Sequence, residues 1–417
     1  MLGGLLFAAG TTLLGNGMVG QSDRIAALDS FTDQGKIDWT KVRKQFLLSS
    51  KKHHFNTGSL GPSPSAVVDK VCDLMRDLEE RAYIGHEFTI PAHKKLAAFL
   101  NTTEEEIAIT RNATEGMNIV ARSLPLKAGD EILLTNHEHI GGAAPWMALQ
   151  KDKGVIVKLV TLDMDGENNL QIIQNNITEK TRVISVSHVT FTTGMRLPVK
   201  EIATLCREKG IYSCIDGAQA VGMIPVDLKA INPDFYVGSG HKWMFGPKGT
   251  GLLFINKATI GACSPVFAGA YSDQEFDLNN LTLVYRNTVQ REEYGTRNTP
   301  IIAGFGRAVD YISAIGIENI ENRGQELANH FLAGLEKIPG IILLTPKNPA
   351  FAASIVTINK KGMDARKTAL KLYKEKRIKV RAIFENDLGG LRISFSIFNS
   401  IKEVDLLLDA LKETLTD

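Results

Sequence analysis

The chain has 417 residues, long enough for two domains that share a large buried core. Its 48 Lys and Arg residues nearly balance 46 Asp and Glu residues, and a net charge of +2 gives no field strong enough to favour nucleic acid or an anionic membrane, so a small molecule is the expected partner. The four cysteines have no C-x-x-C spacing, which argues against a zinc site or a disulfide framework.

The N-terminus is apolar over residues 2–14, and no charged residue precedes Asp23. This length suits the hydrophobic part of a secretory signal, whereas a spanning helix needs about 20 apolar residues. The basic flank of a signal peptide is missing. We interpret residues 1–22 as an apolar tail or signal-like segment and favour a cytoplasmic enzyme, with export as the alternative if a basic segment lies upstream.

From about residue 63, helical and strand patterns alternate. We predict helices at 63–80, 143–153 and 198–209, and strands at 106–110, 131–135, 155–162, 182–188 and 212–216. Short apolar strands that alternate with helices favour an α/β fold with a mostly parallel sheet, covered by helices on both faces. Ligands of such sheets bind at the carboxyl ends of the strands.

After residue 300 the pattern changes to two long helices at about 300–337, followed by strands at 352–359 and 378–384, the stretch 388–397 and a last helix. Helices followed by strands predict a smaller α+β domain. We therefore divide the chain into a segment at 23–62 that packs on the small domain, a large ligand-binding domain at 63–298 and a small C-terminal domain at 299–417.

Lys242 is the most informative residue, because an apolar strand beginning near Asp234 runs into Ser239, Gly240, His241 and Lys242. An amine at a strand end beside aromatic residues would be partly desolvated, which lowers its pKa and frees it as a nucleophile. A lone lysine in a glycine-rich turn is far more often a surface residue. The assignment therefore needs a partner.

Asp216 supplies such a partner, since it ends the strand at 212–216. A carboxylate there can keep a pyridinium nitrogen protonated, and a Schiff-base lysine with an acidic partner for the ring is the pattern of pyridoxal 5′-phosphate (PLP) enzymes. The stretch 110–124 adds a helix N-terminus at Asn112 to Glu115, where backbone N–H groups and Thr114 could bind phosphate. Taken singly, Asp216 and Asn112 could each be ordinary helix caps.

Five motifs in order resemble the class V aminotransferase family of fold type I PLP enzymes, which is related to the cysteine desulfurases. They are ATEGMN (113–118), EHxxxxxPW (138–146), DGAQAVG (216–222), SGHKW (239–243) and GTRN (295–298). The resemblance runs from about residue 55 to residue 400. It implies an α/β large domain that binds PLP, a smaller α+β domain, an amino-acid substrate and a homodimer with shared active sites.

Carried over residue by residue, the resemblance makes Lys242 the Schiff-base lysine, Asp216 the partner of the ring nitrogen and Gln219 the contact of the ring's phenolic oxygen. His139 would stack on the ring. The phosphate would be held by Ala113, Thr114, Ser239 and His241, and Thr296 would reach the phosphate of the neighbouring subunit.

Arg392, in the run GGLRIS, matches the arginine that binds the substrate's α-carboxylate, a role suited to its planar two-pronged donor. A strand-edge arginine is the alternative.

The chain differs from the cysteine desulfurases at one position that matters for the reaction. Those enzymes carry a reactive cysteine shortly before this arginine, and residues 378–392 contain none. Persulfide transfer is therefore not expected, although a C–S lyase that works without a cysteine stays open.

The stretch 187–202 and the run LRISFSIFNS resemble the isopenicillin N epimerase branch, and Phe191 stands where desulfurases have Asn. The implied chemistry is removal of the Cα proton by Lys242 and reprotonation from the other face, with His139 as a candidate donor or merely a ring support. Transamination would use the same lysine.

Other classes find less support in the sequence. His137, Glu138 and His139 lack the H-E-x-x-H spacing of a zinc site, so no metal is expected, and GPKGTG (246–251) does not match an ATP-binding P-loop. A PLP-fold protein that has become a binding module remains the alternative outside the enzymes.

Overall fold

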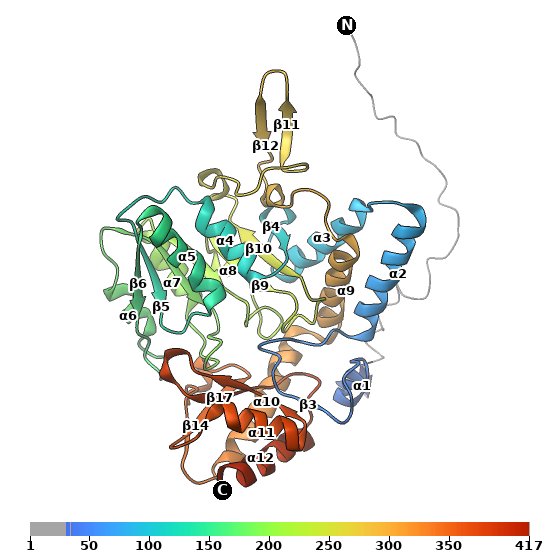
Figure 1. The fold of residues 1–417 in the computed structure, drawn as a ribbon, viewed down its shortest axis with the longest axis vertical. Coiled ribbons are helices and arrows are strands. Elements are labelled where there is room, and N and C mark those ends of the chain that lie inside the picture. Colours follow the sequence, from blue (N-terminus) through green and yellow to red (C-terminus); the bar gives the residue numbers. More distant parts are fainter. Residues whose placement is uncertain (1–30, 34, 417) are drawn as a thin grey trace.

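A computed structural model describes residues 31–33 and 35–416 of the chain (Figure 1). The interpretation of residues 1–22 as a tail or signal-like segment lies outside the described residues. Among those that are described, no single helix is long and apolar enough to cross a membrane, and one pair of helices passes that test only with a bend of 74° between its members.

A seven-stranded sheet forms the centre of the large domain. Its strands, in spatial order, are β4 (Ile107–Thr110), β10 (Gly251–Ile255), β9 (Phe235–Ser239), β8 (Tyr212–Asp216), β7 (Thr181–Ser187), β5 (Glu131–Thr135) and β6 (Ile156–Val160). β10 runs antiparallel to both of its neighbours, while β9, β8, β7, β5 and β6 pair in parallel. The predicted mostly parallel sheet is confirmed, and the five strands with predicted limits, β4, β5, β6, β7 and β8, begin and end within a few residues of them. β10 was not predicted.

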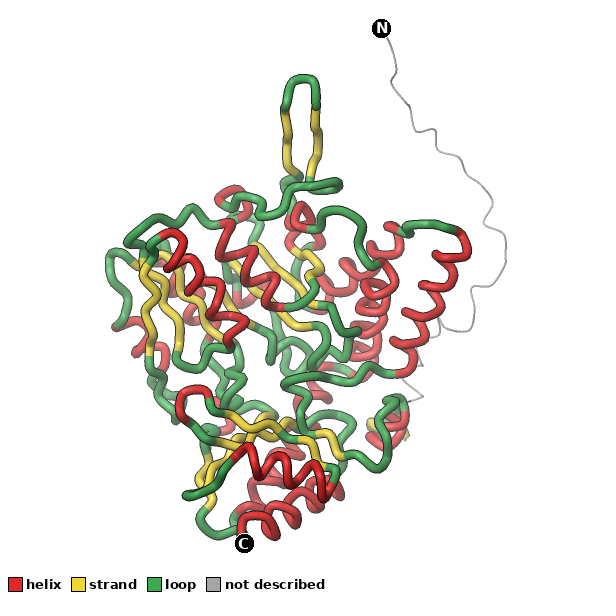
Figure 2. Tube along the Cα trace, in the orientation of Figure 1, coloured by secondary structure: helices red, strands yellow, loops and turns green. Residues whose placement is uncertain are grey.

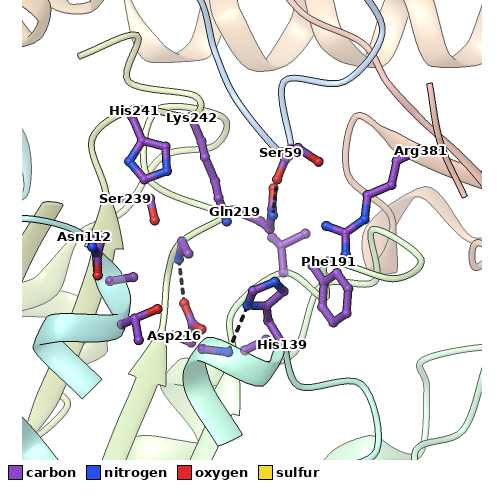
Figure 3. A pocket seen from close by; sticks show the side chains of 17 residues that line it. Ser59, Asn112, His139, Phe191, Asp216, Gln219, Ser239, His241, Lys242 and Arg381 are labelled. Carbon is purple, nitrogen blue, oxygen red and sulfur yellow. Dashed lines mark hydrogen bonds between the residues drawn. The ribbon is translucent and has the colours of Figure 1, made fainter. Parts of the chain in front are cut away.

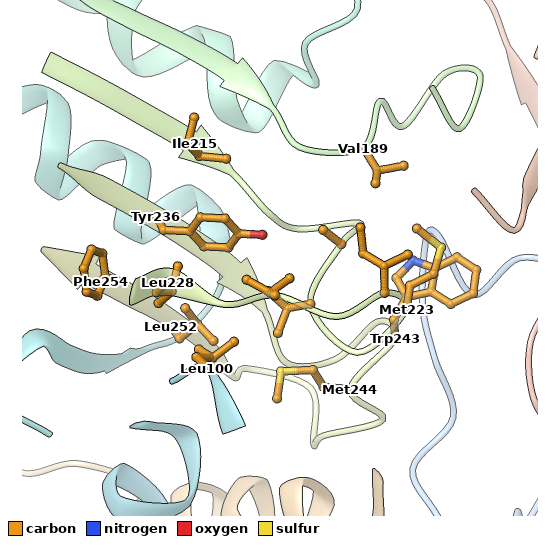
Figure 4. Packing of buried hydrophobic residues seen from close by; sticks show 14 of the residues in the cluster. Leu100, Val189, Ile215, Met223, Leu228, Tyr236, Trp243, Met244, Leu252 and Phe254 are labelled. Atoms are coloured by element: carbon orange, nitrogen blue, oxygen red, sulfur yellow. The ribbon is translucent and has the colours of Figure 1, made fainter. Parts of the chain in front are cut away.

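Helices cover both faces of this sheet, because alternate side chains along each strand enter two different hydrophobic cores. Ile215, Tyr236 and Leu252 point into one core (Figure 4), whereas Cys214 and Val237 point into the other. The first core packs on α3 (Ile90–Phe99), α6 (Asn169–Asn175), α7 (Val199–Glu208), α8 (Leu228–Ile231) and α9 (Thr299–Ile315). The second packs on α4 (Ala113–Ser123) and α5 (Ile140–Lys153).

The small domain contains an antiparallel sheet of four strands, in the order β13 (Ile341–Leu343), β14 (Ile355–Lys360), β17 (Gly390–Ser394) and β16 (Arg381–Ile383). A third hydrophobic core lies between this sheet and α10 (Ile317–Leu335), α11 (Ala365–Lys376) and α12 (Ile401–Thr416). These elements lie together at the C-terminal end of the molecule (Figure 1).

The N-terminal segment contains the short strands β1 (Thr32–Asp33), β2 (Lys36–Ile37) and β3 (His53–His54) and the helix α1 (Trp39–Lys44). β3 pairs in parallel with β15 (Ile378–Lys379). The strand predicted at 378–384 is therefore wrong in detail, because the chain divides into β15, which pairs with β3, and β16, which pairs with β17. The buried side chain of Val380 lies at the break.

The boundary predicted at residue 299 falls at the start of α9, which packs against α3 and against α2 (Ser65–Arg81) in the large domain. Because α9 contributes Ile302, Phe305 and Ile312 to a core of the large domain, the helix joins the two parts of the chain. The division at residue 299 itself stays a prediction.

A hairpin that the sequence did not reveal projects from the large domain. Its strands are β11 (Asp273–Asp277) and β12 (Thr282–Tyr285), and they extend beyond the body of the molecule (Figure 2). Phe276, Leu278 and Leu281 on the hairpin are exposed, with 64%, 78% and 87% of their surface accessible.

Candidate active site

A cavity of about 210 Å³ opens where the carboxyl ends of β8 and β9 meet the N-termini of α4 and α5 (Figure 3). The predicted site residues that line it are Ala113, Thr114, His139, Asp216, Gln219, Ser239, His241 and Lys242. The structure thus brings together groups that are up to 129 residues apart in sequence. Their position at the strand ends agrees with the rule for open α/β sheets.

Lys242 lies in the loop that follows β9, and its side chain extends into the cavity (Figure 3). Burial lowers the pKa of its amine to about 8, and the nearby Arg392 and Arg381 act in the same direction. Asp216 opposes them by favouring the ammonium form. A large fraction of the amine is therefore neutral at mildly alkaline pH, as a nucleophile requires.

Asp216 ends β8 and is buried, with 6% of its surface accessible. Its Oδ1 accepts a hydrogen bond from the backbone N–H of Ala218 at 2.8 Å. Burial raises the pKa of this carboxyl, although the Ala218 bond and Lys242 act against the rise. A Cβ on Gly142 would lie 3.0 Å from Oδ2, so the small residue lets α5 approach the carboxylate closely.

Glu138 interacts electrostatically with Asp216 and was not predicted as a site residue. Its carboxylate is turned inward and accepts hydrogen bonds from the hydroxyl of Thr135 at 2.5 Å and from the hydroxyl and N–H of Ser187 at 2.6 and 3.1 Å. Burial raises its pKa to about 7, and the negative charge of Asp216 adds to the rise. These bonds tie the end of β5 to the end of β7 and fix the loop that carries His139.

His139 caps α5, because its Nδ1 accepts a hydrogen bond from the N–H of Gly141 at 3.1 Å. Its ring meets Phe191 edge-on, with the ring centroids 4.9 Å apart. Burial lowers its pKa to about 4, and the positive charge of Lys242 adds to the effect. The imidazole is therefore neutral near pH 7.

Gln219 is held at both ends of its amide. Trp243 donates from Nε1 to its Oε1 at 2.8 Å, and its Nε2 donates to the carbonyl oxygen of Gly58, also at 2.8 Å. The bond to Gly58 fastens the N-terminal segment across the cavity, where Gly58 and Ser59 contribute to the lining. The motif DGAQAVG therefore links the sheet, the lysine loop and the N-terminal segment.

One end of the cavity suits an anion. The first residues of α4, Ala113 and Thr114, line it together with Ser239 and His241. Asn112 caps the helix by accepting from the N–H of Glu115 at 2.9 Å. Unpaired N–H groups at the start of an 11-residue helix, next to hydroxyl side chains, form a typical site for phosphate.

Arg392 is fully buried on β17 and does not belong to the residues that line the cavity in this structure. It donates to the carbonyl oxygen of Phe191 at 2.8 Å, to Asn56 at 3.1 Å and to Ser59 at 2.9 Å. Among the described residues no carboxylate pairs with it, and its Nε has no partner. A buried cation of this kind is suited to a carboxylate that arrives with a ligand.

Arg381, which the sequence did not single out, lines the cavity directly. Its guanidinium lies 5.3 Å from the centroid of the Phe191 ring and pairs with Glu385 at 3.0 Å. Arg381 lies opposite Arg392 in the β16–β17 pair, a pairing that no local sequence signal reveals.

Thr296 lies outside this cavity. It is exposed and lines a separate hollow with Arg111, Tyr294 and Arg297. The prediction that it reaches the phosphate of a neighbouring subunit stays a prediction. The cysteines also lie elsewhere, since Cys72 is exposed on α2, Cys206, Cys214 and Cys263 are buried, and none lines the cavity. Within the described residues no three His, Cys, Asp or Glu side chains could hold a metal ion.

A buried lysine and a buried aspartate at neighbouring strand ends, with an anion site beside them, define a PLP enzyme of fold type I. The chain belongs to the class V aminotransferase family, because the family profile "Aminotransferase class-V" matches residues 75–407. Enzymes of this family depend on PLP. The fold, the family and the cofactor predicted from the sequence are thereby confirmed.

The curated relatives of this chain include cysteine desulfurases. Cysteine desulfurases of Escherichia coli O8 (strain IAI1) and Shigella sonnei (strain Ss046) are each 32% identical over 326 residues, which cover 74% of this chain and 80% of theirs. The apo cysteine desulfurase of Thermococcus onnurineus NA1 matches with a TM-score of 0.83 and 26% identity, over 90% of this chain and 98% of that one.

The cystine C–S lyase C-DES, in complex with its reaction product cysteine persulfide, also resembles this chain. The TM-score is 0.81 and the identity 25%, over 87% of this chain and 98% of that one. Another C-DES structure holds glycine covalently linked to PLP, with a TM-score of 0.81 and 26% identity over 89% of this chain and 99% of that one.

Proposed function

We propose that the protein removes the Cα proton of an amino acid with Lys242, in a reaction that requires PLP. The observation that carries this proposal is the desolvated Lys242 amine, whose pKa of about 8 lies well below its ordinary value, in the same cavity as the buried Asp216. When bound, PLP supplies an electron sink that weakens the Cα–H bond of an attached amino acid.

We assign each of these residues a separate contact with the cofactor or the substrate. Asp216 would hold a proton on the ring nitrogen, Gln219 would contact the phenolic oxygen, and the start of α4 would bind the phosphate. His139 would support the ring, and Arg392 would bind the α-carboxylate after exchanging a protein partner for it. A homodimer in which Thr296 completes the neighbouring site belongs to the same proposal.

The possible reactions differ in how many side chains must carry the proton. Epimerisation needs an acid on the face opposite Lys242, and His139 is largely deprotonated near pH 7, so it is a poor donor. Elimination and transamination need a single carrier, because Lys242 can pass the proton it removes to a second atom on its own side. The site therefore favours these two reactions over the epimerisation that the run LRISFSIFNS suggested.

Elimination at a C–S bond is the specific reaction we propose. It is supported by the similarity to a cystine C–S lyase and to cysteine desulfurases. It also agrees with the absence of a cysteine from the cavity lining, because breaking the Cβ–S bond needs only a base at Cα and a leaving sulfur. With cystine and water, the products would be pyruvate, ammonia and cysteine persulfide.

The test uses the PLP-loaded protein in D₂O with L-cystine, L-cysteine or L-alanine, each with and without a keto acid. Formation of pyruvate and persulfide from L-cystine without a keto acid is the expected result. Amino-group transfer that depends on the keto acid would replace elimination by transamination, and deuterium at Cα together with the D-enantiomer would establish epimerisation. No turnover of any amino acid would favour the binding module.

A further inference from the structure

The charge of the chain is distributed very unevenly. Residues 360–381 contain ten Lys and Arg residues and two acidic residues, a net charge of +8, so the remainder of a chain with a net charge of +2 carries −6. We call residues 360–381 the basic segment. A local field of this size attracts negatively charged partners even though the whole molecule is nearly neutral.

The basic segment borders a groove of about 650 Å³ on the outer side of the small domain. The groove lies between the end of β14, α11 and the last turn of α12, and α11 and α12 are neighbours in the fold (Figure 1). Its charged lining residues are Lys360, Lys361, Lys367, Lys371, Lys374, Asp364 and Glu375. Five lysines thus face two carboxylates within one groove.

Three of the five lysines that line the groove, Lys361, Lys367 and Lys374, are exposed. The Lys367 side chain is 87% exposed and lies 3.7 Å from Asp364, its neighbour one helical turn earlier. Lys361 and Lys374 are exposed and form no ion pair with any described residue. Exposed ion pairs of the Lys367 type contribute little energy, so these lysines can exchange their contacts for those of a partner.

The groove also has an apolar part. Leu370 on α11 lines it with half of its surface exposed, and Met363 and Leu415 line it as well. Leu370 follows Lys367 by three residues and precedes Lys374 by four, so the three side chains share one face of α11. A partner that fits this face therefore combines carboxylates with at least one apolar side chain.

We propose that this groove docks an acidic polypeptide segment of another protein. α11 has 12 residues, which is about 18 Å of helix, and an extended segment of five or six residues spans about the same length. A nucleic acid is a poorer match, because a long polyanion would meet the net negative charge of the rest of the surface. A membrane surface is flat and does not fill a groove.

The docked segment would lie near the active site. Arg366 of α11 stacks over Phe384 at 4.9 Å, and Phe384 directly follows β16, whose first residue Arg381 lines the catalytic cavity. Binding on α11 therefore takes place on the element that is joined to one wall of the cavity.

The experiment measures binding of a fluorescent acidic dodecapeptide of Glu, Asp and Leu to the full-length PLP-loaded protein by anisotropy. The double variant K367E/K374E is expected to bind roughly tenfold more weakly. The control K151E/K200E changes the net charge equally, at two exposed lysines of the large domain, and is expected to bind like the unmodified protein. Leu370→Ser should weaken binding of this peptide but not of one in which Ser replaces Leu.

Four results would overturn the proposal. An equal loss of binding in K151E/K200E would reduce it to an effect of net charge. If a 20-base-pair DNA duplex bound more tightly than the peptide, and K367E/K374E lost this binding, the groove would be assigned to nucleic acid. The same result with phosphatidylserine vesicles would assign it to a membrane surface. Absence of peptide binding at low salt, where electrostatic attraction is strongest, would remove the site altogether.

Discussion

Arg392 donates a hydrogen bond from Nη1 to the carbonyl oxygen of Phe191 at 2.8 Å. The bond joins β17 of the small domain to the loop that follows β7 in the large sheet, so a residue predicted to bind substrate also links the two parts of the chain. Burial lowers the pKa of Arg392 to about 9, and the positive charge of Arg381 acts in the same direction. A carboxylate from the substrate would stabilise this buried cation.

Arg392→Lys should therefore weaken binding of the amino acid, because lysine keeps the charge but loses the two-pronged geometry. We expect KM to rise by roughly tenfold or more and kcat to change less. Arg76→Lys, at an exposed arginine of α2 that does not line the cavity, is the matched control and should leave KM unchanged. A KM in Arg392→Lys equal to that of the unmodified protein would remove the residue from the substrate site.

Lys242→Ala should abolish turnover and the yellow absorbance of lysine-bound PLP. Lys248→Ala changes another lysine of the same loop, six residues later, that is exposed and does not line the cavity, so it should retain both properties. Absorbance spectra and amino-acid turnover of the two variants check this prediction. Normal activity in Lys242→Ala would refute the proposed function.

Loading of the apoprotein with PLP should accelerate as the pH rises through about 8, the pKa of the Lys242 amine, because the neutral amine is the reacting form. Asp216 raises this pKa, so Asp216→Asn should shift the midpoint of the rate profile to lower pH. Stopped-flow absorbance across pH 6 to 10 measures both profiles. A midpoint near the ordinary lysine value of about 10.4 would show that Lys242 is not desolvated.

The sequence predicted Lys242, Asp216 and the phosphate site at the start of α4, because each of them follows a strand in a local pattern that the chemistry of PLP requires. It did not predict Arg381 or Glu138, whose roles arise only when separate elements meet. The strand predicted at 378–384 breaks at Val380 and changes its pairing partner, and Arg381, which lines the cavity, begins its second part. No local pattern encodes such contacts between distant segments.

The fold was predictable where hydrophobic periodicity is strong, as in the strands of the large sheet and in α9 and α10. The β11–β12 hairpin was missed because its strands are largely exposed. Exposed strands lack the alternation of buried and exposed residues on which strand prediction depends.

Glu138 should make the stability of the protein depend on pH. Its pKa is about 7 when folded and near 4.5 when unfolded, so between these values the folded state binds more protons. Stability from this group is therefore complete at low pH and is lost as the pH rises from 4.5 to 7, by up to about 3 kcal/mol. Glu138→Gln removes this loss.

Urea unfolding of both proteins at pH 5 and pH 8 measures the effect. Relative to the unmodified protein, the free energy of unfolding of Glu138→Gln should be larger at pH 8 than at pH 5, so the variant gains relative stability as the pH rises. Taking this difference removes contributions from distant groups, such as Glu292, that titrate in the same range. A difference that does not change with pH would mean that Glu138 is not desolvated as its contacts indicate.

Gly222 and Gly249 have the same backbone conformation, with positive φ of +86° and +85°. Comparing an alanine at each position therefore isolates the effect of close packing near the lysine loop. A Cβ on Gly222 would lie 2.7 Å from the backbone of Trp243, whereas one on Gly249 would meet nothing within 4 Å. Gly249→Ala should therefore cost only the backbone strain, about 1 kcal/mol. Gly222→Ala should cost about 3 kcal/mol, since overpacking adds to that strain.

Gly222→Ala should also weaken PLP binding, because moving Trp243 displaces both Lys242, the preceding residue, and the hydrogen bond from Trp243 to Gln219. Chemical denaturation of the two apoproteins gives the free energies, and PLP titration gives the affinities. Because the two glycines share the same backbone conformation, any excess loss in Gly222→Ala comes from the contact with Trp243. Equal losses in both variants would mean that the lysine loop can shift without disturbing the site.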